Sequence, residues 1–176
     1  MLVIDNFLPN PCRVRREALR ADYIDWPGPD GEVYKRICIT EIPGVREGIR
    51  KAIGREPDIL GMGYRLNFNE ELPNAAIHSD IGWGTHALVL YLSHGCGGTA
   101  LWRHNATGAE RFEPAIFEDV RHDWDEPGKW TQVGLCEQQF NRGVIYESAL
   151  FHSRWPFEAA GTTPETGRLI AVAFFN

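Results

Sequence analysis

The sequence contains no long hydrophobic run: nowhere in its 176 residues does an apolar stretch approach the ~18–20 residues that cross a membrane. It is also short of positive charge, since 18 Lys and Arg residues stand against 24 Asp and Glu residues, a net charge of -6. A nucleic-acid-binding domain normally has a basic face. These absences argue against a membrane partner and against a nucleic-acid partner.

Cysteine is scarce, and its spacing carries no motif. The 4 cysteines, Cys12, Cys38, Cys96 and Cys136, lie far apart and form no CxxC pair. This excludes a zinc knuckle and a thioredoxin-like motif. The first five residues have neither the basic segment nor the cleavage site of a secretory signal. We therefore predict a cytoplasmic protein with reduced thiols.

The composition is that of an ordinary globular domain, with 43% hydrophobic and 24% charged residues. A chain of this length corresponds to one domain, so we predict a single domain over 1–176. Its first part, 1–58, is expected to supply an N-terminal strand and helical support. The second part, 59–176, is expected to form the core. The polar stretch 105–130, interrupted by Gly and Pro, is predicted to be a lid or insert.

Helical patterns occur only before residue 58. An Asn-Pro start followed by apolar residues at helical spacing predicts a helix over 11–23. A second helix is predicted over 45–53, ended by Gly54. Residues 1–7 are predicted to contain a short strand, and the Pro- and Gly-rich stretch 26–31 a loop.

Short strand-like segments separated by turns follow residue 58. This order predicts a mainly β (α+β) fold with a double-stranded β-helix, or jelly-roll, core. The N-terminal helices are expected to pack on the outer face of the larger sheet. The predicted strands are 59–68, 75–78, 86–92, 99–104, 130–140, 144–147 and 169–175.

The most informative motif is His78-Ser79-Asp80. Residues two apart on a strand share a face, so His78 and Asp80 can reach one metal ion. A second histidine, His152, comes just after a later predicted strand. Two histidines and one carboxylate form the facial triad of non-haem Fe(II) oxygenases. The alternative is structural: Asp80 can cap the turn that follows it, and each histidine can be an ordinary hydrogen-bonded residue.

An arginine at the start of the last apolar strand adds a second signal. Arg168 precedes a run of residues that we expect to be buried. A guanidinium there is costly unless it meets an anion, and its planar fork suits a carboxylate. The alternative is that Arg168 lies outside the barrel in solvent.

Several segments, taken in order, resemble the 2-oxoglutarate- and Fe(II)-dependent dioxygenases, particularly the prolyl-hydroxylase-like branch. The resemblance covers about 59–176 and extends loosely to the opening strand and helix. The matching segments are Gly63-Tyr64-Arg65-Leu66-Asn67, His78-Ser79-Asp80, Leu88-Val89-Leu90-Tyr91-Leu92, Gly97-Gly98-Thr99-Ala100-Leu101 and Asn141-Arg142-Gly143-Val144-Ile145-Tyr146, followed by His152 and Arg168.

The resemblance implies an Fe(II) enzyme that uses 2-oxoglutarate and O2 as co-substrates and hydroxylates a C–H bond. It implies that His78, Asp80 and His152 are the iron ligands and the catalytic centre.

The same resemblance implies that Arg168 binds the distal carboxylate of 2-oxoglutarate. Tyr91 and Tyr64 fall where relatives have tyrosines that contact this co-substrate. The separation of His152 from Arg168 is longer than is usual in the family, which leaves Arg154 as a competitor for the same role.

The substrate is expected to be a small molecule or an amino-acid or peptide side chain. Candidate substrate contacts near the mouth of the site are Arg154, Trp83, Trp102 and Arg103. Two alternatives remain open: a cupin-like metal enzyme that does not use 2-oxoglutarate, and a non-catalytic jelly-roll binding module. The sequence gives no indication of the oligomeric state.

Overall fold

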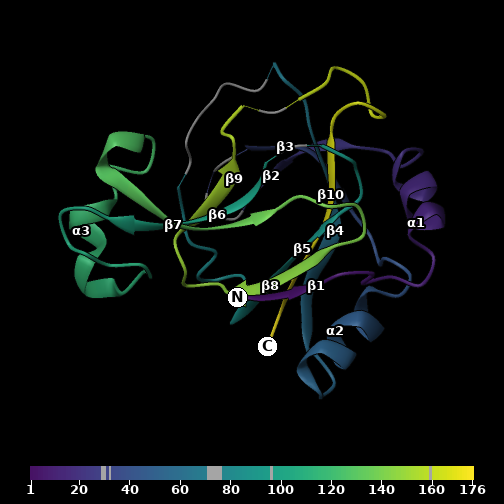
Figure 1. Ribbon diagram of the computed structural model, residues 1–176, viewed down its shortest axis with the longest axis horizontal. Helices are drawn as coiled ribbons and strands as arrows, with labels where there is room; N and C mark the ends of the chain where they lie inside the picture. The colour runs from purple at the N-terminus through teal and green to yellow at the C-terminus, as the bar shows by residue number, and fades with distance from the viewer. Residues whose placement is uncertain (29–30, 32, 71–76, 96, 159) are drawn as a thin grey trace.

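The computed structural model describes residues 1–28, 31, 33–70, 77–95, 97–158 and 160–176. Within these residues the chain is mainly β, with antiparallel strands in two sheets (Figure 1). The strands are β1 (Leu2–Ile4), β2 (Ile24–Pro27), β3 (Val33–Ile39), β4 (Ile59–Asn67), β5 (His86–Tyr91), β6 (Gly98–His104), β7 (Trp130–Glu137), β8 (Gly143–Glu147), β9 (His152–Trp155) and β10 (Arg168–Phe175). The helices are α1 (Pro11–Ala18), α2 (Val45–Ile53) and α3 (Phe117–Val120), with 3-10 turns at Pro114–Ile116 and Pro127–Lys129.

The larger sheet has the strand order β1-β8-β5-β10-β4-β3-β2, and the smaller sheet has the order β7-β6-β9. Alternate residues of the central strands face opposite sides, as the two-residue period of a strand requires. One face joins side chains of α1 and α2 in a buried cluster that includes Val14, Ile49, Tyr64, Leu90 and Ala171. Figure 1 shows both helices on the same side of the molecule, beside β4 and β10.

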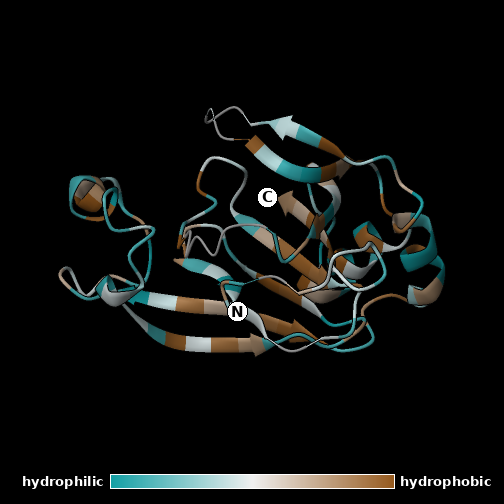
Figure 2. Ribbon diagram, turned by 90° about the horizontal axis from the view of Figure 1, so that it is seen from above, coloured by the Kyte–Doolittle hydropathy of each residue, from teal (hydrophilic) through white to brown (hydrophobic). Residues whose placement is uncertain are grey.

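The opposite face of the larger sheet turns toward the smaller sheet. Its buried residues include Val89, Tyr91, Tyr146 and Ile170, and they cluster with Cys136 of β7. Figure 2 shows the hydrophobic colour concentrated on these central strands. The predicted mainly β, jelly-roll-like architecture is therefore confirmed, and it leaves the space between the sheets for a site.

The helix over 45–53 is confirmed to the residue. Gly54 ends it in the left-handed region, with φ 74°, and its N–H donates to the Arg50 carbonyl. The first helix is shorter than predicted, because it ends at Ala18 and not at residue 23. The hydroxyl of Tyr23 donates to the Ala18 carbonyl at 2.9 Å, so this residue closes the helix end from outside it.

The predicted loop over 26–31 is wrong at its start. Ile24–Pro27 forms β2, which pairs with β3, and both strands extend the larger sheet beyond β4. Proline lacks an N–H donor and is tolerated on an edge strand. β2 is the last strand of the sheet, so Pro27 is tolerated in it and β2 still pairs with β3.

The prediction of a strand over 75–78 falls partly outside the described residues. Ile77 and His78 are described, and His78 forms an isolated antiparallel bridge with His152. The strand β9, which starts at His152, was not predicted, because His-Ser-Arg-Trp lacks a clear apolar alternation.

The segment 105–130 is an insert between β6 and β7. It carries α3 and lies at one end of the molecule, far from α1 and α2 (Figure 1). Backbone hydrogen bonds tie its ends to the core, among them Phe151 N–H to the Glu110 carbonyl at 3.0 Å. Cys12, Cys38 and Cys136 carry free thiols, and Cys96 lies outside the described residues. None of the helices in the described ranges is long and apolar enough to span a membrane.

Gly98 lets β6 pass closely beside β7. A Cβ atom at Gly98 would overlap the carbonyl oxygen of Cys136 in β7. We expect Gly98→Ala to lower the free energy of unfolding by about 1–3 kcal/mol, because the strands must separate to accept the methyl group. Gly128 has open space around it, so Gly128→Ala is the matched control. Urea unfolding should detect the first change and show a change within about 0.5 kcal/mol for the second.

Candidate metal centre

Two backbone pairings bring the predicted metal ligands together. His78 N–H donates to the His152 carbonyl at 3.0 Å, and His152 N–H donates to the His78 carbonyl at 2.9 Å. Asp80 N–H donates to the Ser148 carbonyl at 2.8 Å, which fixes the residue that follows the bridge. The site is thus assembled by main-chain hydrogen bonds between segments that lie far apart in the sequence.

The three side chains converge. His78 Nε2 lies 3.5 Å from Asp80 Oδ1, and His152 Nε2 lies 3.2 Å from Asp80 Oδ2. One ligand atom from each residue lies within 4.8 Å of the others. His152 and Asp80 are largely buried, whereas the His78 side chain is 39% exposed. The cluster therefore opens to solvent on the His78 side.

The electrostatics keep Asp80 ionised. Burial by itself would raise the pKa of the Asp80 carboxyl. The charge and hydrogen bond of His152, together with those of His78, outweigh burial and hold this pKa well below its usual range. Tyr146 lies beside the pair, with its hydroxyl 3.5 Å from Asp80 Oδ2. A carboxylate that stays charged in a buried place is the form that binds a cation.

A hydrogen bond fixes the orientation of the His152 ring. Its Nδ1 lies 2.9 Å from the Leu150 carbonyl oxygen, which can only accept, so Nδ1 is a donor. Nε2 faces Asp80 and is the ring nitrogen left to bind a metal ion. A hydrogen bond from the other ring nitrogen to a backbone carbonyl, as between Nδ1 and Leu150, is the arrangement that orients a metal-ligating histidine. Two imidazoles and one carboxylate, held this way, fit a divalent transition metal such as Fe(II).

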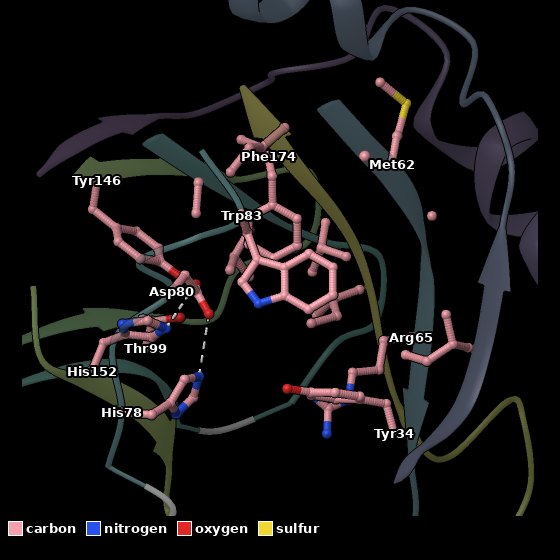
Figure 3. Close-up of a pocket in the computed structure, with 18 of the residues that line it drawn as sticks. Tyr34, Met62, Arg65, His78, Asp80, Trp83, Thr99, Tyr146, His152 and Phe174 are labelled. Carbon is pink, nitrogen blue, oxygen red and sulfur yellow. Dashed lines mark hydrogen bonds and ion pairs between the residues drawn. The ribbon is translucent and has the colours of Figure 1, made fainter. Parts of the chain in front are cut away.

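The triad lies in a cavity of about 320 Å³ between the two sheets. Figure 3 shows His78, Asp80 and His152 on one side of it, Trp83 and Phe174 in its middle, and Tyr34 with Arg65 on the other side. Further lining residues come from β3, β4, β5, β6, β9 and β10; they include Ile37, Ile39, Leu60, Val89, Thr99, Ser153, Arg168, Ile170 and Val172.

Arg168 lines this cavity from the start of β10. Its Nη1 lies 3.4 Å from Asn67 Oδ1, a long contact, and no described residue offers an acceptor to its buried Nε. Burial lowers the pKa of Arg168 to about 10; the Tyr91 hydroxyl opposes this, and the nearby Arg154 and Arg65 add to it. The guanidinium is thus a half-buried cation without an anion among the described residues that contact it.

The ring of Tyr91 lies next to the guanidinium of Arg168. The Arg168 guanidinium lies 5.7 Å from the centre of the Tyr91 ring. The Tyr91 hydroxyl is 2.7 Å from Thr99 Oγ1 and donates to the Cys136 carbonyl at 3.3 Å. Thr99 lines the cavity, but Tyr91 itself does not. Tyr91 therefore positions Arg168 and Thr99.

The structure does not bring Tyr64 to the cavity. Its side chain is buried in the cluster that contains the helices, on the opposite face of the larger sheet. Its neighbour Arg65 lines the cavity instead, with its guanidinium 5.8 Å from the centre of the Tyr34 ring. The expectation that Tyr64 contacts a co-substrate is therefore corrected, and the alternation along β4 identifies Arg65 as the residue on that face.

Of the four predicted substrate contacts, only Trp83 lines the cavity. Trp102 is buried in another cluster and donates from Nε1 to Ser153 Oγ at 2.9 Å. Arg103 is exposed and pairs with Glu110 at 3.7 Å. Arg154 donates from Nε to the Phe157 carbonyl at 2.9 Å and lines a smaller cavity beyond Arg168.

No residue of 105–130 in the described chain lines the large cavity; the segment connects β6 to β7. A buried pair fixes this insert: His104 Nε2 lies 3.0 Å from Asp123 Oδ2, and His104 Nδ1 lies 3.0 Å from Thr107 Oγ1. The Asp123 carbonyl also accepts from Trp130 Nε1 at 2.8 Å. The His104–Asp123 distance is similar to the His152–Asp80 distance, but the His104–Asp123 pair stabilises the packing of the insert.

We expect His104→Ala to lower the free energy of unfolding by about 2–4 kcal/mol, because it leaves a hole and removes a partner of Asp123. Metal binding to the folded variant should be unchanged, since His104 does not line the cavity. Chemical unfolding and a metal titration measure the two effects separately. A loss of metal affinity as large as the loss of stability would contradict this separation.

Comparison with known proteins gives a family and a fold. Residues 1–175 match a family of unknown function, DUF6445. No curated protein matches the sequence. The non-heme alpha ketoglutarate dependent epimerase SnoN from nogalamycin biosynthesis is similar over 98% of this chain and 76% of its own, with a TM-score of 0.56 and 13% identity.

Two further solved structures show the same likeness. SnoN in complex with Fe3+, alpha ketoglutarate and nogalamycin RO is similar over 98% of this chain and 77% of its own, with a TM-score of 0.55 and 14% identity. AviO1 from Streptomyces viridochromogenes Tue57 is similar over 95% of this chain and 85% of its own, with a TM-score of 0.52 and 12% identity. At these identities the likeness establishes a common fold.

Proposed function

We propose that this chain, which belongs to the family of unknown function DUF6445, is an Fe(II)- and 2-oxoglutarate-dependent oxygenase that hydroxylates a C–H bond. One observation carries the proposal: a two-histidine, one-carboxylate cluster shares a cavity with a guanidinium whose buried Nε has no acceptor among the described residues. The fold shared with SnoN, a non-heme alpha ketoglutarate dependent epimerase, supports it. Membership of the prolyl-hydroxylase-like branch remains our prediction.

In this proposal His78, Asp80 and His152 hold the iron. Bound Fe(II), with 2-oxoglutarate and O2, supplies an oxidant that can take hydrogen from a C–H bond, and succinate and CO2 are formed. The chain prepares the ligands for this task. The two histidines keep Asp80 charged, and the Leu150 carbonyl accepts from Nδ1 of His152 and so orients Nε2 toward the site.

Arg168 is the residue that we assign to the distal carboxylate of 2-oxoglutarate. Its planar fork can donate two parallel hydrogen bonds to a carboxylate. The co-substrate would give the buried Nε the anionic partner that the described residues lack. The Tyr91 ring lies next to the guanidinium. Thr99, which is hydrogen-bonded to the Tyr91 hydroxyl, presents a polar side chain to the same cavity.

The cavity volume of about 320 Å³ lies at the lower end of the range for small-molecule sites. This supports a small-molecule or amino-acid side-chain substrate in place of a folded macromolecule. Arg154, which we expected to contact the substrate, holds the 154–157 turn through the Phe157 carbonyl. We therefore assign it a positioning role near Arg168.

The test is an assay for succinate with reduced protein, Fe(II), O2 and 2-oxoglutarate, in the absence of any substrate. Slow, iron-dependent succinate release is the expected result. A cupin-like metal enzyme would bind metal but leave 2-oxoglutarate unchanged. A non-catalytic binding module would show neither property, and either outcome would overturn the proposal.

A further inference from the structure

Four aromatic side chains from three separate segments gather in the cavity next to the triad. Trp26 and Tyr34 come from the β2–β3 hairpin, Trp83 from the turn after Asp80, and Phe174 from β10. Ring centres are 5.6 Å apart for Trp26–Trp83, 6.3 Å for Tyr34–Trp83 and 5.4 Å for Trp83–Phe174. We call these four residues the aromatic cage.

Trp83 is the centre of the cage, because it contacts each of the other three rings. It is stacked on Phe174 at 29° and meets Tyr34 edge-on at 87°. The backbone N–H of Trp83 donates to the Asp80 carbonyl at 3.1 Å, which fixes the turn that carries the indole relative to a predicted metal ligand. Figure 3 shows the indole projecting into the cavity beside Asp80.

The cage has no fully buried ring, unlike the second aromatic cluster of the chain. The second aromatic cluster contains Trp102, Trp130 and Phe151, which are only 4%, 5% and 0% exposed, as a core requires. All four cage residues are instead half-buried, although they are large and mostly apolar. They line an open cavity, and each keeps part of its surface exposed.

The mouth of the cavity near the cage is also apolar. Ile39 and Leu60 line it and remain 60% and 53% exposed. A continuous apolar surface that is left in contact with water commonly marks a place where a ligand binds. Flat rings pack against aromatic side chains by offset stacking or edge contacts at centre distances of about 4.5–7 Å, and the cage offers both geometries.

We propose that the aromatic cage binds a flat aromatic ring of the substrate and so presents a neighbouring C–H bond to the triad. This inference rests on the proposed function for the identity of the reaction, but ring binding itself requires only the cage. Trp83 is then the residue that determines specificity, since it is the one ring of the cage in contact with the other three.

Two carboxylates of equal charge test the proposal by calorimetry on the metal-free protein: indole-3-acetate, which has a flat ring, and cyclohexylacetate, which does not. We expect the wild type to bind indole-3-acetate about five- to tenfold more tightly, in keeping with the energy of aromatic contacts. Trp83→Leu should abolish this preference, and Tyr34→Leu should reduce it. Trp124→Leu, in the insert, is the control and should keep it.

Equal binding of the two probes, no binding of either, or a preference that survives in Trp83→Leu would overturn the cage proposal. A melting curve for each variant establishes that it is folded, and Tyr34→Leu gives a second reading if Trp83→Leu is not. Asp80→Ala separates the two proposals, because it should keep the ring preference. A wild type that prefers the ring but releases no succinate would refute the proposed function alone. The reverse pattern would refute the cage alone.

Discussion

Asp80→Ala is expected to weaken Fe(II) binding by at least about 100-fold and to abolish succinate formation. Changing a residue that only orients a ligand already costs about 10–100-fold in metal affinity, and Asp80 supplies the sole carboxylate of the cluster. It also lies between the two histidines, at 3.5 Å and 3.2 Å from their Nε2 atoms. Metal analysis after dialysis against Fe(II) under anaerobic conditions gives the affinity.

Asp119→Ala is the matched control for this change. Asp119 is an exposed residue of α3, outside the cavity. Its removal should leave both metal content and succinate formation at the wild-type level. If Asp80→Ala retained stoichiometric iron with near wild-type affinity, the assignment of the triad would be wrong.

Arg168→Ala is expected to raise the Kd for 2-oxoglutarate by about 30- to 4,000-fold. This range corresponds to the roughly 2–5 kcal/mol lost when one partner of a buried, charged hydrogen-bonded pair is removed. Arg168→Lys should fall in between, because an ammonium keeps the charge but lacks the planar fork. Titration of 2-oxoglutarate into Mn(II)-loaded protein measures binding without turnover.

The neighbouring arginine is the control for this second prediction. Arg154 also lies close enough to lower the pKa of Arg168, but it bonds the Phe157 carbonyl and lines only the smaller cavity. We expect Arg154→Ala to change the Kd by less than about threefold, as for a surface charge pair. A larger effect for Arg154→Ala than for Arg168→Ala would show that the two roles are reversed.

Most of the fold follows from local patterns that tertiary contacts did not override. The apolar spacing of 45–53 and a glycine able to adopt positive φ specify α2 completely. The β2–β3 hairpin was missed because Trp26-Pro27-Gly28 has the composition of a turn. The proline is tolerated because β2 is an edge strand. The order of strands in the sheet depends on the whole chain and cannot be read from this segment alone.

The site was predictable where the argument used side-chain direction, and not elsewhere. The two-residue period of a strand places His78 and Asp80 together, and the structure brings the third predicted ligand, His152, to them. The same period decides against Tyr64, because β4 turns Tyr64 and Leu66 to the helices and Arg65 to the cavity. The glycines at 61 and 63, small residues on the cavity side, were the signal that could have identified this face.

The remaining cavity residues depend on contacts between distant segments. Trp83 could be predicted because it follows Asp80 closely, whereas Trp102 and Arg103 were placed by strand order alone and lie elsewhere. Trp26 and Tyr34 reach the cavity through a hairpin that no local pattern predicted. The sequence therefore predicted the cluster of candidate metal ligands better than the other residues that line the cavity.

The most direct test of the central claim is an anaerobic calorimetric titration of 2-oxoglutarate into the wild type with and without Fe(II). We predict one binding site per chain that requires the metal, is lost on chelation, and is lost separately in Asp80→Ala and Arg168→Ala. Binding of 2-oxoglutarate with the same affinity in the absence of metal, or no binding in its presence, would contradict the claim that the triad and Arg168 form one co-substrate site.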